Sequence, residues 1–149
     1  MSFGNLISPE FKHNLAVYNI KIGAVIRILV KETIPPKVKY LVVVGLDGGS
    51  ISFATIYINT EINMNVINTP ELQNLQVWLE SSKCQTLEHD SYADCSKIVE
   101  RNILEVAAYI AKNPASELGM LEKKYLTNVL ELLKTAATII PYHKKKYGF

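Results

Sequence analysis

Three runs of β-branched and other apolar residues predict strands over residues 20–30, 40–46 and 51–58. In the first run, Arg27 stands at a period-two position among apolar neighbours. Residues 47–50 (DGGS) separate the second and third runs and predict a tight hairpin turn whose glycines take positive φ values. In the third run, alternate side chains fall on two faces: Phe53, Thr55 and Tyr57 on one, and Ile51, Ala54, Ile56 and Ile58 mostly on the other.

A lysine-rich segment joins the first two runs. Residues 31–39 read KETIPPKVK, and the two adjacent prolines favour an extended loop because they cannot donate ladder hydrogen bonds. Lys31, Lys37 and Lys39 form either a cationic rim for phosphate or a solvated loop face. Arg27 either projects into a binding groove or pairs across the sheet on its outer surface.

The middle of the chain is less regular. Residues 59–69 are rich in Asn and Thr and predict a loop. Thr69-Pro70-Glu71 is typical of a helix start, although residues 74–78 fit a strand equally well. Residues 84–87 predict a further strand that enters a turn.

The last third has helical spacing. Asn102 and Glu105 resemble an N-cap and its capping partner for a helix over residues 103–111. A longer helix is predicted over residues 121–140, ended by Pro141 and followed by a basic tail over residues 141–149. Its apolar stripe comprises Leu126, Val129, Leu130, Leu133, Ala137 and Ile140.

Strands followed by helices predict an α+β domain or a small barrel with appended helices. The 149 residues are enough for a single domain, in which residues 1–19 form an N-terminal extension. A composition of 48% hydrophobic and 20% charged residues is typical of a globular protein. The formal net charge of +2 excludes a strongly basic nucleic-acid-coating protein, but not a local cationic site.

The same composition sets expectations about compartment and cofactors. Two cysteines are too few for a disulfide framework and are expected to be reduced thiols. No metal-ligand spacing is present, so we expect no metal and no cofactor. The N-terminal sequence MSFGNLISPE is unlike a signal peptide, and the apolar runs are too short to span a membrane. We therefore expect a cytoplasmic protein without membrane association.

Two polar pairs are candidates for chemistry. His89 and Asp90 are the best acid–base candidates, since histidine exchanges protons near neutral pH and an adjacent carboxylate can orient a base. The alternative is a polar turn before a helix, with Asp90 or Asp94 as the cap. Asn59 and Thr60 either contact a phosphate oxygen or end a strand by local hydrogen bonding.

Several segments, taken in order, resemble the PemK/MazF-like family of toxin endoribonucleases from toxin–antitoxin systems. These segments are residues 23–28 (GAVIRI), 39–44 (KYLVVV), 56–60 (IYINT) and 87–95 (LEHDSYADC), with Gly119 before the last helix. The resemblance implies a small SH3-like β-barrel with C-terminal helices, a homodimer, and an antitoxin protein that covers the RNA groove. It also implies metal-independent cleavage of single-stranded RNA, in which the ribose 2′-hydroxyl attacks the neighbouring phosphate.

The resemblance also implies roles for individual residues. Lys39 stands where the family usually has an arginine and would stabilise transition-state charge, and Thr60 would bind the phosphate. Asp90 or His89 would transfer the proton. Glu88 stands where a catalytic arginine would be wanted. The alternative function is therefore a non-catalytic nucleic-acid- or protein-binding module on the same barrel.

Overall fold

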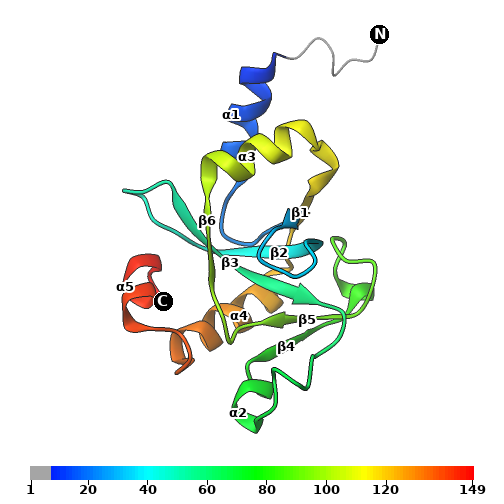
Figure 1. Cartoon of the computed structure of the whole chain (residues 1–149), viewed down its shortest axis with the longest axis vertical. Helices are drawn as coiled ribbons and strands as arrows, with labels where there is room; N and C mark the ends of the chain where they lie inside the picture. The colour runs from blue at the N-terminus through cyan, green and yellow to red at the C-terminus, as the bar shows by residue number, and fades with distance from the viewer. Residues whose placement is uncertain (1–7) are drawn as a thin grey trace.

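The computed structural model describes residues 8–149 and shows a curled, antiparallel, seven-stranded sheet with several helices (Figure 1). Neighbouring strands follow the order β4-β5-β3-β2-β1-β7, and β6 pairs with β3. The α+β class predicted from the order of elements is confirmed. The helices are α1 (Pro9–Asn19), α2 (Pro70–Gln73), α3 (Ile103–Lys112), α4 (Lys123–Thr135) and α5 (Pro141–Tyr147). The strands are β1 (Ala24–Val30), β2 (Lys37–Leu46), β3 (Ser52–Asn59), β4 (Gln76–Leu79), β5 (Ser91–Asp94), β6 (Val99–Asn102) and β7 (Glu117–Met120).

The first three strands form the predicted meander, with two corrections. β2 begins at Lys37, so Lys37 and Lys39 belong to a strand rather than to the loop before it. The turn after β2 is closed by a hydrogen bond from Ser50 N to Asp47 O at 3.0 Å. Neither of its two glycines has a positive φ, so the predicted turn geometry is wrong.

Both faces of β3 are buried, which divides the core in two. On one face, Phe53 and Tyr57 pack with residues of β1, β2 and α3 in a cluster that we call the α3 core. On the other face, Ala54 and Ile56 pack with residues of β4, β5, α4 and α5 in a second cluster, the α4–α5 core. The two-faced pattern read from the sequence is therefore confirmed. Figure 1 shows α1 and α3 at one end of the molecule and α4 and α5 at the other.

The middle segment contains both of the alternatives that the sequence left open. Thr69 caps the short helix α2 through a hydrogen bond from Leu72 N to Thr69 Oγ1 at 3.2 Å, and β4 follows directly. Residues 84–87 form no strand, contrary to the prediction; they lie in a turn, with Cys84 and Leu87 buried in the α4–α5 core. Both cysteines are free and buried.

The C-terminal region differs most from the prediction. Asn102 caps α3 as expected, because its side chain accepts hydrogen bonds from Leu104 N and Glu105 N. The long helix, however, ends at Thr135, and Ile140, predicted to belong to its buried stripe, is 53% exposed. Pro141 begins α5 instead of ending a helix, since proline fits the first turn, where its missing N–H has no partner.

The predicted basic tail is therefore an ordered helix. Tyr147 of α5 is buried in the α4–α5 core. A Cβ added at Gly45 would lie 2.6 Å from the Cβ of Tyr147, so only glycine at this position of β2 lets α5 pack so closely.

The ends of the chain bear on two further expectations. The N-terminal segment expected not to be a signal peptide falls mostly on residues 1–7, outside the described residues, and the rest of the predicted extension contains α1. Within residues 8–149, every helix is too short or too polar to cross a membrane.

Candidate functional site

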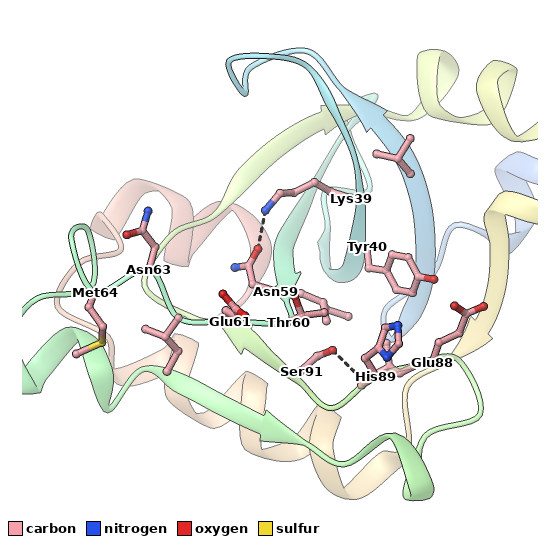
Figure 2. A pocket seen from close by; sticks show the side chains of 14 residues that line it. Lys39, Tyr40, Asn59, Thr60, Glu61, Asn63, Met64, Glu88, His89 and Ser91 are labelled. Carbon is pink, nitrogen blue, oxygen red and sulfur yellow. Dashed lines mark hydrogen bonds between the residues drawn. The ribbon is translucent and has the colours of Figure 1, made fainter.

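An open pocket of about 650 Å³ lies where β3 leaves the sheet, and we call it the β3-end pocket (Figure 2). Its walls come from β2, from the end of β3 with the loop that follows, and from the segment that enters β5. The lining residues are Val38, Lys39, Tyr40, Ile58, Asn59, Thr60, Glu61, Ile62, Asn63, Met64, Leu87, Glu88, His89 and Ser91.

The pocket collects predicted site residues from three separate parts of the sequence. Lys39 comes from β2, Asn59 and Thr60 from the end of β3, and His89 from the bend before β5. Lys39 and Tyr40 are consecutive on a strand, so their side chains leave opposite faces of the sheet. The pocket takes in both of them because it lies at the end of the strands.

Lys39 is held by a neutral partner. Its Nζ donates a hydrogen bond to Asn59 Oδ1 at 2.6 Å, and Figure 2 shows the two side chains pointing toward one another. Burial is the main cause that lowers the pKa of Lys39 from its ordinary value of 10.5; the charges of Lys37 and Lys97 also lower it, and Asp94 opposes them. Within residues 8–149 no carboxylate forms an ion pair with Lys39, so its positive charge is left for an anion.

Thr60 and His89 are exposed at the pocket. Thr60 is the first residue after β3, and its hydroxyl is one of the polar groups of the wall. The backbone carbonyl of His89 accepts a hydrogen bond from Ser91 Oγ at 2.8 Å, which fixes the bend that presents the imidazole (Figure 2). Both side chains are therefore accessible to a ligand.

Asp90 does not line the pocket. Its Oδ1 accepts hydrogen bonds from Ser81 N at 2.8 Å and from Ser81 Oγ at 3.0 Å. These contacts tie the segment before β5 to the short 3-10 helix η2 (Ser81–Lys83). Of the adjacent pair His89–Asp90, only the histidine lies at the pocket. Asp90 is followed by the strand β5, so its contacts with Ser81 are not the cap of a following helix that the alternative describes.

The other predicted cations lie outside the pocket wall. Arg27 is exposed on β1 and pairs in register with Tyr40, which places it beside the pocket on the face that Tyr40 shares. Lys31 and Lys37 are exposed. Lys37 is near enough to lower the pKa of Lys39 by charge repulsion.

A hydrogen-bonded network beside Lys39 was not predicted from the sequence. Tyr57 Oη donates a hydrogen bond to Glu32 Oε1 at 2.6 Å, and Arg101 Nη2 donates to the same oxygen. Burial alone would raise the pKa of Glu32, but the hydrogen bonds from Arg101 and Tyr57 outweigh it and lower that pKa to about 2. Burial and Glu32 together raise the pKa of Tyr57 to about 12. The ring of Tyr57, whose centroid lies 5.0 Å from Lys39 Nζ, is thus fixed in place.

Sequence reasoning missed this network because its members come from three separate segments that meet only in the folded chain. Glu32 lies in the loop after β1, and Arg101 lies on β6, which no apolar run predicts. Glu61, Glu88 and Tyr40 are further pocket residues without a predicted role as acid, base or ligand contact. Only the expectation that polar residues gather where strands end could have drawn attention to Glu61.

The pocket combines a cation, a hydroxyl, an imidazole and carboxylates in one open hollow. This set suits a phosphate ester, because the ammonium and the hydroxyl match phosphate oxygens and the imidazole can transfer a proton. In the part of the chain that the structure describes, no group of three or more His, Cys, Asp or Glu side chains is placed to hold a metal ion. Neither a protein-family model nor a curated protein matches this chain.

Proposed function

We propose that this protein is a PemK/MazF-like, toxin-type endoribonuclease that cleaves single-stranded RNA without a metal ion at the β3-end pocket. One observation carries the proposal: Lys39, Thr60 and His89, which come from three separate segments, line one pocket. The curl of the antiparallel sheet, with β7 paired to β1, supports the SH3-like barrel that the resemblance implies.

The reaction assigns a role to each of the three side chains. The 2′-oxygen of a ribose attacks the adjacent phosphorus, the bond from phosphorus to the 5′-oxygen breaks, and a 2′,3′-cyclic phosphate and a 5′-hydroxyl result. Lys39 stabilises the negative charge of the phosphorane, and Thr60 donates a hydrogen bond to a phosphate oxygen. His89 transfers a proton.

A second proton-transfer group is needed, because one group removes the 2′-hydroxyl proton and another protonates the leaving 5′-oxygen. Asp90 is unsuited, since both of its contacts are with Ser81 outside the pocket. The carboxylates that line the pocket are Glu61 and Glu88, and both are exposed. The proposal therefore pairs His89 with one of these two glutamates.

The resemblance also brings a homodimer, an antitoxin partner and a cytoplasmic location into the proposal. The exposed side chains Phe11, Leu15 and Tyr18 recur at helical spacing on α1, which supports a protein partner because such an apolar stripe is more often covered than solvated. Analytical ultracentrifugation measures whether the protein sediments as a dimer. An antitoxin is expected to inhibit RNA cleavage by covering the pocket.

Two observations favour the alternative, a binding module without catalysis. The ammonium of Lys39 is already hydrogen-bonded to Asn59, and Glu88 stands where the family's chemistry would want an arginine. A lysine also lacks the planar fork with which arginine binds phosphate in two places. Such a site would still bind RNA but leave it intact.

Cleavage of a labelled single-stranded RNA in EDTA separates the two functions. We expect the wild type to cut the RNA and both His89→Gln and Lys39→Ala to lose about 10²-fold or more in rate. His13→Gln on α1 is the matched control, because it removes a histidine away from the pocket, and it should keep the wild-type rate. Binding without cleavage in the wild type would establish the alternative, and cleavage that persists in both variants would refute the assigned site.

A further inference from the structure

The sheet carries a row of side chains that extends beyond the β3-end pocket. Tyr40 pairs with Ile58, which sets Lys39 opposite Asn59; Asn59 pairs with Tyr92, and Tyr92 pairs with Trp78. Residues paired in register project from the same face of a sheet. Lys39, Asn59, Tyr92 and Trp78 therefore form a continuous row across β2, β3, β5 and β4, which we call the aromatic row. With strands about 4.8 Å apart, it is about 14 Å long.

The aromatic end of the row is open to solvent. Val77, Leu79 and Ala93 point into the α4–α5 core, so the alternation along β4 and β5 turns Trp78 and Tyr92 outward. Trp78 is 44% exposed, and its ring centroid lies 5.0 Å from that of Tyr92 with the planes inclined at 61°. A tryptophan in the interior of a strand that is left this exposed indicates a surface for a ligand.

The other end of the row is positively charged. The ring centroid of Tyr57, two residues before Asn59 on β3, lies 5.0 Å from Lys39 Nζ, 5.7 Å from Lys97 Nζ and 5.9 Å from Arg101 Cζ. Glu32 is paired with Arg101. Neither Lys39 nor Lys97 forms an ion pair with any residue in the range 8–149.

The carboxylate on the same part of the sheet is already engaged. Asp94 Oδ1 accepts hydrogen bonds from Gln76 Nε2 at 2.8 Å and from Ser96 N at 3.0 Å. It raises the pKa of Lys39 by its charge without contacting it, whereas Lys37 and Lys97 lower that pKa. A bound anion would relieve this repulsion between the lysines.

We propose that the aromatic row is a binding surface for single-stranded RNA, on which bases stack against Trp78 and Tyr92 while phosphates bind Lys39 and Lys97. Clustered cations beside exposed aromatic rings match the alternating phosphates and bases of a single strand, whereas a protein partner has no matching alternation. The inference rests on the proposed function for the identity of the ligand. Because Lys39 belongs both to the row and to the β3-end pocket, the RNA would pass from the row into the site of cleavage.

Trp78 is the one tryptophan of the chain, so its emission reports directly on the row. The probe is a 12-nucleotide 2′-O-methyl RNA, which lacks the attacking hydroxyl and stays intact. Stacking of a base should quench the emission in parallel with binding measured by fluorescence anisotropy of a labelled oligonucleotide. Trp78→Ala should weaken binding by about 5- to 100-fold, and Trp78→Phe should recover part of the loss. Tyr142→Ala, a truncation of an exposed aromatic side chain on α5, whose helix packs against the opposite core, is the control and should bind as the wild type does.

The phosphate contacts are tested by salt dependence. The logarithm of the binding constant falls as the logarithm of the salt concentration rises. Lys97→Gln should make this slope less steep by about 0.7, the change expected for one lost phosphate contact with a single strand. Lys124→Gln on α4 removes an exposed lysine whose helix packs on the opposite core, and it should leave the slope unchanged.

The outcomes separate this inference from the proposed function. Suppose that the wild type cleaves RNA, that RNA does not quench Trp78 emission, and that Trp78→Ala binds RNA normally. The aromatic row is then not an RNA-binding surface, and the proposed nuclease activity is retained. Quenching and tight binding without cleavage would support the row and refute the nuclease. If the wild type neither binds nor cleaves RNA, both fail. If Trp78→Ala alters the sedimentation coefficient but not RNA binding, the row is a protein interface, and the inference is wrong.

Discussion

The close contact between β2 and α5 makes Gly45→Ala a sharp test of how the C-terminal helix is held. The three atoms nearest to a Cβ at this position all belong to Tyr147, at 2.6, 3.0 and 3.2 Å. The nearest of them is the Cβ of Tyr147, which cannot rotate away. The substitution must therefore displace α5 as a whole.

The expected cost follows from what α5 contributes. Tyr147 is 5% exposed, and burying an aromatic side chain of this kind contributes about 1.5–3 kcal/mol. Its hydroxyl also donates a hydrogen bond to Glu100. Overpacking of a dense core costs about 1–3 kcal/mol. We expect Gly45→Ala to lower the free energy of unfolding by about 2–4 kcal/mol, mostly through strain or lost burial at Tyr147.

A double-mutant cycle in urea, followed by Trp78 emission and circular dichroism, measures this coupling. In the Tyr147→Gly background, Gly45→Ala should cost less than about 0.5 kcal/mol, because the obstructing Cβ is gone together with the ring. Gly48→Ala is the control: its Cβ would meet nothing within 4 Å, so it should be nearly neutral. An equal cost of Gly45→Ala in both backgrounds would show that Tyr147 is not the obstacle and would refute the reasoning.

Three further predictions concern charge and the pocket. Hydrogen bonds from Tyr147 and Lys146 lower the pKa of Glu100 from 4.5 to about 2, so its contribution to stability should be present above pH 4.5 and disappear as the pH falls toward 2. In urea, the difference in free energy of unfolding between the wild type and Glu100→Gln should shrink over that range. A difference that stays constant would contradict this prediction. Asp90→Ala should reduce stability by about 1 kcal/mol while the rate of RNA cleavage per folded molecule is retained, and a loss of rate at full stability would return Asp90 to the catalytic set. Of Glu61→Gln and Glu88→Gln, one should lower kcat by about 10²-fold and remove one limb of the pH–rate profile, whereas unchanged profiles in both would show that neither glutamate transfers a proton.

The elements that could be predicted from the sequence are those whose local signals agree. Residues 40–46 and 51–58 are runs rich in β-branched and other apolar residues, and all of them except Ile51 lie in strands of the structure. Asn102 combines a cap residue with a following apolar helix, and it caps α3. The prediction that Pro141 ends a helix was wrong, because proline also fits the first turn of a helix, and Pro141 begins α5. Cys84 and Leu87 are apolar because they are buried under a turn, not because they pair in a sheet.

For the candidate site, the sequence indicated which residue types were suitable but not which of them meet. Lys39, Thr60 and His89 were predicted as polar residues at strand or turn positions, and they line one pocket. His89 and Asp90 are adjacent, and only tertiary contacts decide that Asp90 binds Ser81. The aromatic row needs the register of three strand pairs, which a single sequence does not contain.

The ends of the RNA products test the central claim most directly. A single-stranded RNA is incubated with the protein in EDTA, and the ends of the products are identified by mass spectrometry. The account predicts 2′,3′-cyclic phosphate and 5′-hydroxyl ends that disappear with His89→Gln and with a 2′-deoxy substitution at the scissile position. Intact RNA, or products with 5′-phosphate ends, would contradict it.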